Sequence, residues 1–251
     1  MDNFWLNELL KAVVLYGSAY FLGLWVIKRG TRVNYTRKVF HFVLFFFPLL
    51  LADHLPFQAS ITTTLLSGLI FLLCIGTFIQ PLRARSGFLS TAYAAIDRPE
   101  DRPFTLLWLS TQVVATYLVI VLMVLCLAHY GKQPLIYIAV LVAGIGDGLA
   151  EPVGVRFGKR KYRVNALFTD RSYTRSLEGS ACVFLSAIVA VLILRSHLTE
   201  TQLFLALGIV PVAMTLAEAF SPHTWDGPIL YLVGGMSLIG VLELSGMVAN
   251  A

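Results

Sequence analysis

The sequence predicts an all-α integral membrane protein, a polytopic bundle of about eight transmembrane helices. Two observations lead to this prediction. Of the 251 residues, 57% are hydrophobic and only 13% are charged, whereas soluble domains carry about 25% charged residues. Apolar runs also recur along the whole chain, several of them long enough to cross ~30 Å of hydrocarbon. No stretch of useful length remains for a soluble domain, so residues 1–251 are predicted to form a single membrane domain.

Hydropathy indicates eight spanning segments in chain order. The segments are Leu6–Ile27, Lys38–Ala52, Ala59–Ile79, Leu106–Tyr130, Leu135–Ala150, Leu177–Leu194, Thr201–Phe220 and Pro228–Val248. The second and fifth are short, but each has polar residues at one end, so we expect their helices to continue beyond the apolar core. Within the loop after the third segment, Gly87–Tyr93 is a candidate interfacial helix, and Asp97–Pro103 should be turn-rich and solvated.

The basic residues predict the orientation of the chain. All but three of the 19 Lys and Arg residues lie in the loops after the first, third and fifth segments; the exceptions are Lys11, Lys132 and Arg195. An even number of spans puts these loops on one face, which the positive-inside rule makes cytoplasmic. Both termini are then expected outside. The net charge of +5 therefore reflects topology and does not indicate a nucleic-acid partner.

The cysteines and the first apolar run exclude three further kinds of feature, namely a zinc site, a disulfide framework and a cleavable signal peptide. Cys74, Cys126 and Cys182 lie in separate apolar runs, so neither a zinc site nor a disulfide framework is indicated. The first apolar run is too long for the core of a cleavable signal and is followed by basic residues. A compact chain without a transit peptide is expected in a prokaryotic plasma membrane.

The first cluster that could carry chemistry surrounds Asp147, at the end of the fifth apolar segment. A carboxylate at the membrane boundary is costly and should pair with or ligate a cation. Its neighbours Gly146 and Gly148 allow a ligand or another backbone to approach closely, and Glu151 lies one helical turn away on the same face. Two such carboxylates can hold Mg²⁺ together with substrate phosphates. The alternative is helix packing through the glycines, with Asp147 bonded to a neighbouring helix.

The second cluster follows directly and combines Gly154 and Gly158 with a dense set of cations. These cations are Arg156, Lys159, Arg160, Lys161 and Arg163. Flexible backbone donors and fixed cations suit phosphate binding, although the Walker A order of residues is absent. An ordinary positive-inside loop or a patch that binds anionic lipid would have the same composition.

The third cluster opens the sixth segment. Arg175 precedes Ser176, a candidate N-cap at a helix N-terminus, where an anion is favoured. Glu178 should line a polar site rather than face lipid. Simple capping of a transmembrane helix is the alternative explanation.

Two further clusters lie near the same predicted face. Arg37, Lys38 and His41 can share one helix face, where His41 could face phosphate or bond a neighbouring helix. Glu218 ends the seventh segment and Asp226 begins the eighth, and acids buried there are functional candidates. The Asp-Gly-Pro sequence at that point is also ordinary turn chemistry.

These clusters, in this order, resemble the membrane family of CTP-dependent lipid-alcohol kinases. The family includes dolichol, phytol and farnesol kinases and a CTP-dependent diacylglycerol kinase, and it is distantly similar to the CDP-diacylglycerol synthases. The family's Arg-Lys-x-x-His motif is matched by Arg37-Lys38-Val39-Phe40-His41. Its Gly-Asp-x-x-Ala run is matched by Gly146-Asp147-Gly148-Leu149-Ala150, followed by Gly154, Gly158 and Lys159. Its Lys/Ser-x-Glu-Gly element is matched by Ser176-Leu177-Glu178-Gly179-Ser180, with Arg175 in place of the usual Lys. Glu218 and Asp226 match its C-terminal acids, but Gly227 replaces the usual Asn.

The resemblance implies a kinase that phosphorylates a long-chain isoprenoid or other lipid alcohol, of the phytol, farnesol or polyprenol/dolichol type. It implies CTP as donor and Mg²⁺ as cofactor, with the active site facing the cytoplasm. The implied metal ligands are Asp147, Glu151, Glu218 and Asp226. The implied nucleotide and phosphate contacts are Arg37, Lys38, Gly154, Gly158, Lys159, Arg160, Arg175 and Ser176. The implied catalytic residues are Asp147, Glu178 and His41, and the general base is open between Asp147, Glu178 and Asp226.

Two other functions fit parts of the sequence. The first is a cytidylyltransferase that forms a CDP-lipid, which would use the same metal and triphosphate contacts but release pyrophosphate instead of CDP. The second is a non-enzymatic lipid transporter. A transporter would distribute its acids and cations along a path through the bilayer, whereas here they gather on one predicted face.

Overall fold

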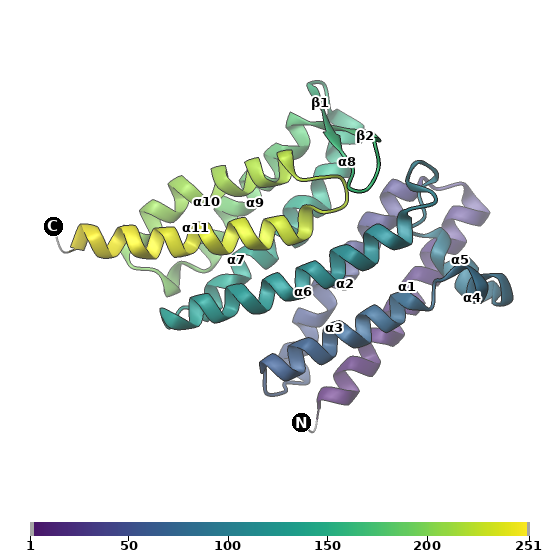
Figure 1. Ribbon diagram of the computed structural model, residues 1–251, viewed down its shortest axis with the longest axis horizontal. Coiled ribbons are helices and arrows are strands. Elements are labelled where there is room, and N and C mark those ends of the chain that lie inside the picture. Colours follow the sequence, from purple (N-terminus) through teal and green to yellow (C-terminus); the bar gives the residue numbers. More distant parts are fainter. Residues whose placement is uncertain (1–2, 250–251) are drawn as a thin grey trace. The chain divides into compact units, whose positions relative to one another are not determined.

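The computed structural model describes residues 3–249 and confirms the predicted all-α membrane bundle (Figure 1). It divides into two compact units, Met1–Tyr117 and Leu118–Ala251, and the boundary falls inside the long helix α6, Thr105–His129.

The first unit is built from α1 to α5 and the first part of α6. Its elements are α1 (Phe4–Arg29), α2 (Val33–His54), α3 (Ile61–Gly76), α4 (Gln80–Arg85), α5 (Gly87–Ala94) and the 3₁₀ turn η1 (Pro99–Asp101). Its core joins Leu15 and Leu22 of α1 to Phe40 of α2 and Tyr93 of α5. The short helix predicted at Gly87–Tyr93 is confirmed as α5.

The segment from Asp97 to Pro103 is turn-rich, as expected, and four of its seven residues are exposed. Asp97, Arg98 and Asp101 are buried, which contradicts the expectation that solvent covers the whole segment. The Asp101 side chain forms an ion pair of 2.7 Å with Arg98, and both residues are buried. Asp97 accepts hydrogen bonds from Thr105 Oγ1 at 2.9 Å and from Arg102 Nε at 2.7 Å. The charges are buried because they neutralise one another, which removes the main penalty for taking them out of water.

The second unit contains the C-terminal part of α6 and everything that follows. Its further elements are η2 (Gln133–Leu135), α7 (Ile136–Leu141), the π-helix η3 (Val142–Asp147), α8 (Gly148–Phe157), β1 (Lys161–Asn165), β2 (Ser172–Ser176), α9 (Leu177–Ile193), η4 (Arg195–His197), α10 (Glu200–Phe220) and α11 (Asp226–Ala249). α10 packs against both α9 and α11.

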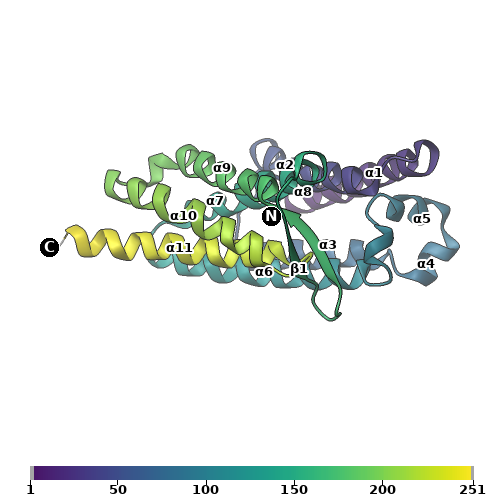
Figure 2. The same ribbon diagram turned by 90° about the horizontal axis from the view of Figure 1, so that it is seen from above.

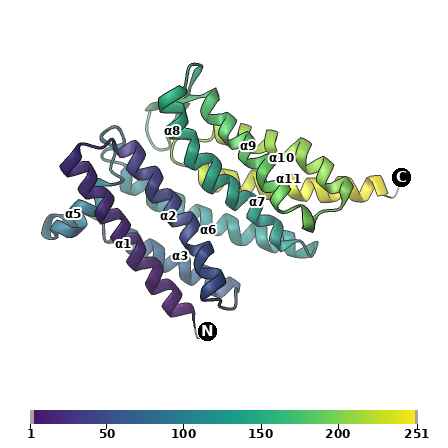
Figure 3. The ribbon, with the colours of Figure 1, turned by 180° about the vertical axis from the view of Figure 1, so that it is seen from behind.

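α7, η3 and α8 follow one another directly in a helical rod that packs along α9 (Figure 3). The two helices approach closely at Gly146, where a Cβ atom would lie 3.0 Å from Val183 Cα of α9. The π-helical part ends at Asp147, and π-helical turns inside α-helices are frequent at functional sites. A glycine and a local widening of the helix therefore place Asp147 beside α9.

The basic segment after α8 forms an antiparallel hairpin that the sequence did not predict. Tyr162 pairs with Arg175, and Val164 pairs with Tyr173. Because strand residues alternate between two faces, these four share the inner, more buried face, while Lys161 and other exposed residues form the outer face. Figure 2 shows the hairpin running across the ends of α9 and α10.

Within residues 3–249, six helices are long and apolar enough to cross a membrane. They are Phe4–Arg29, Val33–His54, Thr105–His129, Gln133–Phe157, Glu200–Phe220 and Asp226–Met247. Two shorter apolar helices, α3 and α9, have 16 and 17 residues, fewer than the ~20 that usually span a bilayer. The expected extension of the second and fifth segments beyond their apolar cores is confirmed by α2 and α8. The side of the membrane on which the termini lie stays a prediction.

Candidate functional site

Arg175 lies at the centre of the candidate site in the second unit. Its guanidinium is 3.2 Å from Glu218 Oε1 at the end of α10 and 3.7 Å from Asp226 Oδ2 at the start of α11. The side chains of Arg175 and Glu218 are only 13% and 5% exposed. The charge of Asp147 also acts on Arg175. Acids from the ends of three helical segments therefore interact with one buried cation.

Electrostatics keep this arginine charged despite its burial. Burial alone would lower the pKa of Arg175, but the carboxylates of Asp226, Glu218 and Asp147 outweigh that effect and raise the pKa above its ordinary value. A guanidinium with several carboxylates around it is a stable arrangement only when each charge has a partner. Arg175 thus acts as the counter-ion of the acid cluster, which we define as Asp147, Glu218 and Asp226.

A chain of hydrogen bonds orients Glu218. Ser180 Oγ donates to Glu218 Oε2 at 3.0 Å, and it lies 2.7 Å from the hydroxyl of Tyr162. Because a serine hydroxyl has one proton, Tyr162 must be the donor to Ser180. Arg175 also donates to Ser221 Oγ at 3.1 Å, and Ser221 donates to the Glu218 carbonyl at 2.9 Å. Burial and the negative charge of Glu218 raise the pKa of Tyr162, which keeps this donor protonated.

Glycines at the α8–α9 contact allow this arrangement. A Cβ atom at Gly154 would lie 2.8 Å from Ser176 Oγ, and one at Gly179 would lie 2.6 Å from the Ala150 carbonyl oxygen. A Cβ at Gly158 would overlap the Gly154 carbonyl and Ser176. The Gly158 N–H donates to that same carbonyl at 3.0 Å. In the structure these glycines bring the start of α9 against α8.

The N-terminus of α9 is capped as the sequence predicted. Ser176 Oγ accepts from Gly179 N at 3.1 Å. Glu178 Oε1 lies 3.4 Å from the backbone N–H of Arg160, and its Oε2 is buried without a hydrogen-bond partner among the described residues. The Leu177 N–H donates to the Arg160 carbonyl at 3.0 Å. The carboxylate of Glu178 therefore faces the base of the hairpin, and one of its oxygens has unused capacity.

The hairpin is also attached to the loop between α10 and α11. The rings of Tyr173 and His223 stack, with centroids 3.5 Å apart and planes 8° apart. The backbone N–H of His223 donates to the Asn165 carbonyl at 2.9 Å. The ring contact therefore holds β2, which carries Arg175, and the backbone bond holds its partner strand β1. Together they give the guanidinium a defined position relative to Glu218 and Asp226.

The other predicted site residues of this unit differ in how far their side chains are exposed. Lys159 and Arg160 are exposed at the turn between α8 and β1, and Glu151 is half-buried on α8. The residues that could hold a metal ion do not form a ready-made site, since no group of three or more His, Cys, Asp or Glu side chains within residues 3–249 is arranged to hold one.

Arg37, Lys38 and His41 belong to the first unit, on α2. Lys38 is buried, and the His41 ring contacts Phe45 with centroids 4.5 Å apart. All three side chains have interactions within the protein. Their joining with the acid cluster in one site stays a prediction.

Sequence reasoning missed Tyr162, Ser180 and Ser221. The alternation of Tyr162 and Val164 with polar residues over five positions is the pattern of a half-buried strand, and a second such pattern at Tyr173 and Arg175 would have indicated a hairpin. The serines carry no comparable signal, because a small hydroxyl in an apolar helix is usually bonded to its own backbone.

The chain matches no protein-family model, no curated protein and no solved structure to which it was compared.

Proposed function

We propose that this protein is a CTP-dependent kinase that phosphorylates a long-chain isoprenoid or other lipid alcohol at the cytoplasmic face of the membrane. The observation that supports the proposal most strongly is the convergence of Asp147, Glu218 and Asp226 on buried Arg175. Acids at the ends of membrane helices are costly, so a cluster of them with a fixed cation favours function over structure.

The cluster suits phosphoryl transfer because that reaction depends on positioning and charge neutralisation more than on covalent chemistry. Arg175 is fixed by Glu218 and Ser221, so it can contact an anionic phosphate without first losing conformational freedom. Lys159 and Arg160, exposed at the adjoining turn, would contact the rest of the triphosphate. Arg37, Lys38 and His41 are assigned to the same phosphates from the resemblance alone.

Mg²⁺ fits this site as an ion that arrives with the nucleotide. Asp147 and Asp226, with Glu151 as a further candidate, would supply the oxygen ligands that Mg²⁺ prefers, and one or two carboxylates plus phosphate oxygens usually suffice. When bound, the ion would neutralise charge on the phosphates.

The lipid alcohol would enter from the bilayer, with its apolar tail between helices and its hydroxyl near the ends of α8 and α9. The group that accepts the hydroxyl proton is left open between Asp147, Glu178 and Asp226, because backbone N–H groups at Lys159 and Arg160 already interact with the Glu178 carboxylate. Glu218 is less suited to that role since both of its carboxylate oxygens already bind Ser180 and Arg175. We assign Glu218 to holding Arg175.

The proposal predicts that Asp147→Asn abolishes CTP-dependent phosphorylation of lipid alcohols while membrane insertion stays intact. The matched control is Asp170→Asn, which removes an exposed carboxylate at the hairpin tip of the same unit. Purified variants are incubated with Mg²⁺, γ-labelled CTP and phytol, farnesol or a polyprenol, and label in the lipid fraction is measured. Near-normal turnover by Asp147→Asn would rule out its assigned role.

A further inference from the structure

We propose that the β1–β2 hairpin is an interfacial anchor whose outer face binds the headgroups of anionic phospholipids in the surrounding bilayer. The first argument is its position in the chain. The hairpin starts just after α8, which completes the apolar candidate span Gln133–Phe157, and it runs directly into the apolar helix α9. Both of its ends are therefore attached to helices that lie in the membrane, so the hairpin lies at the membrane boundary.

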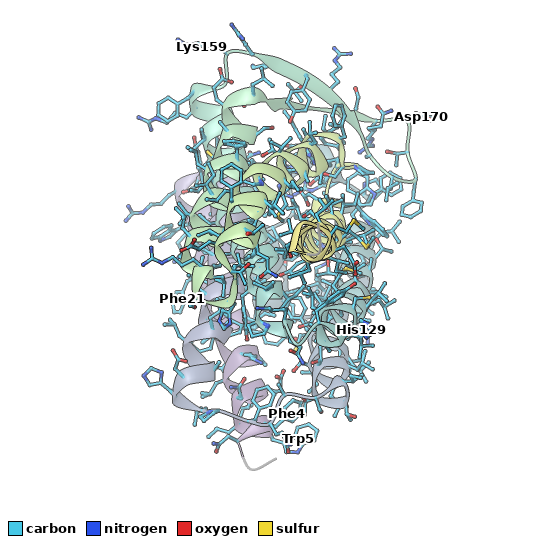
Figure 4. The ribbon with its side chains drawn as sticks, turned by 90° about the vertical axis from the view of Figure 1, so that its left-hand side faces the viewer. Phe4, Trp5, Phe21, His129, Lys159 and Asp170 are labelled. Carbon is cyan, nitrogen blue, oxygen red and sulfur yellow. The ribbon has the colours of Figure 1, made fainter. Side chains whose placement is uncertain are left out.

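The second argument is its direction. Figure 4 looks along α11 and shows Lys159 and Asp170 at opposite ends of the hairpin. Figure 2 shows the strands running across the helices. Because α11 is one of the candidate spans, strands that cross its axis lie along the membrane surface. The outer face can then contact headgroups along its exposed part, which includes Lys161, Arg163 and Thr174, whereas Ser176 at the end of that face is buried against α8.

The third argument is charge. Lys161 and Arg163 on the outer face of β1 are exposed, as is Arg171 beside the tip. Lys161 and Arg163 lie opposite the small hydroxyl residues Ser176 and Thr174, so no bulky side chain covers them. Clusters of Lys and Arg beside membrane helices bind anionic lipid headgroups. The charge of this face is complementary to such a surface.

The fourth argument is the hairpin tip. Phe168 is 65% exposed and has a positive φ of 64°, a conformation that is uncommon for a bulky residue. Phe157, at the end of α8, is 60% exposed. Aromatic side chains beside cations are typical of the membrane–water interface, where the ring is apolar and the surroundings are wet. Phe168 would therefore insert at the headgroup level.

The outer cations are assigned to lipid and not to the nucleotide because of strand alternation. Arg175 and Tyr162 share the inner face with the acid cluster, whereas Lys161 and Arg163 project from the opposite face. The proposal is consequently independent of the proposed enzymatic function.

Hydrogen–deuterium exchange of the purified full-length protein in nanodiscs tests the proposal. Exchange of the segment 161–176 should be slower in discs that contain phosphatidylglycerol than in discs of phosphatidylcholine alone. The double variant Lys161→Gln/Arg163→Gln should reduce this difference by up to about five-fold per cation removed, because each cation near an anionic surface contributes about that factor. The matched control is Arg195→Gln, which removes an exposed cation beyond the other end of α9, and it should keep the difference.

The tip is tested by Phe168→Ser, which should speed exchange of the tip in both lipid compositions. Equal exchange of wild-type protein in the two kinds of disc would overturn the proposal, as would a lipid-dependent difference that the double variant keeps. Protection of the outer strand by CTP in phosphatidylcholine discs, without any effect of phosphatidylglycerol, would assign these cations to the nucleotide and also overturn it.

Discussion

Replacement of Arg175 by methionine should destabilise the protein strongly. The change keeps an unbranched side chain, shorter than that of arginine, and removes the cation that neutralises Glu218 and Asp226 at 3.2 and 3.7 Å. Glu218 is almost completely buried, so water cannot replace the lost partner. Breaking a buried ion pair by removing one member costs about 3–5 kcal/mol, because an uncompensated charge remains inside the protein. We expect a loss of that size in the free energy of unfolding.

The matched control for this prediction is Arg102→Met. Arg102 lies closer to its acid than Arg175 does, at 2.7 Å from Asp97, but its side chain is 59% exposed. Exposed ion pairs contribute only about 0–1 kcal/mol. If distance decided the energy, Arg102 would matter more; because burial decides it, Arg175 should matter more.

The assay is reversible SDS-induced unfolding of the purified protein in mixed micelles, followed by circular dichroism. The double variant Arg175→Met/Glu218→Gln should recover part of the stability, since it removes one of the charges left unpaired. The reasoning is refuted if Arg102→Met costs as much as Arg175→Met, or if the double variant is less stable than Arg175→Met alone.

Three further predictions follow from the packing and the charges. Gly179→Ala should lower the melting temperature, because the added methyl would lie 2.6 Å from the Ala150 carbonyl oxygen and overpacking costs about 1–3 kcal/mol. Gly208→Ala should raise the melting temperature, because nothing lies within 4 Å of the added methyl and alanine is favoured over glycine in a helix by about 1 kcal/mol. Shifts of the same sign in both variants would contradict the packing argument. Asp101→Asn should lower the free energy of unfolding by about 3 kcal/mol, because buried Arg98 loses its charged partner. A smaller loss than that of Arg102→Met would show that water solvates the Arg98–Asp101 pair. Because the pKa of Tyr162 is raised, the folded protein holds the phenol proton more tightly than the unfolded chain does. The stability advantage of the wild-type protein over Tyr162→Phe should therefore be constant below about pH 10 and fall above it. An advantage that grows with pH would show that the pKa of Tyr162 is lowered by folding.

The apolar helices could be predicted from the sequence because membrane helices are specified by composition over long windows. The runs near Leu6–Ile27 and Thr201–Phe220 correspond to α1 and α10 within a few residues. A span limited by polar residues, such as Lys38–Ala52, is longer in the structure, since backbone hydrogen bonding continues a helix beyond its apolar part.

The hairpin could not be predicted because its signal is short and mixed. Five residues in each strand, with charged residues on the outer face, resemble a solvated loop more than a sheet. The pairing of Tyr162 with Arg175 also depends on contacts between residues distant in the sequence. The same limit applies to Asp101, which its turn-rich segment predicts to be exposed but which pairs with buried Arg98 in the structure.

The acids of the candidate site could be selected from the sequence alone, and their role in a reaction stays a prediction. Asp147, Glu218 and Asp226 were selected because a carboxylate is costly at the membrane boundary, and the structure brings their charges together. What the sequence did not reveal is that Arg175 is their shared counter-ion, because burial and side-chain direction on a strand depend on the tertiary fold.

The most direct test of the central claim is to identify both products of the reaction. Wild-type protein in nanodiscs is supplied with Mg²⁺, a panel of lipid alcohols and either CTP or ATP labelled on the γ-phosphate. Our account predicts that CTP transfers its label to the lipid alcohol and that CDP is released in equal amount. Release of pyrophosphate with formation of a CDP-lipid would contradict it in favour of a cytidylyltransferase, and lipid counterflow without any consumption of nucleotide would contradict it in favour of a transporter.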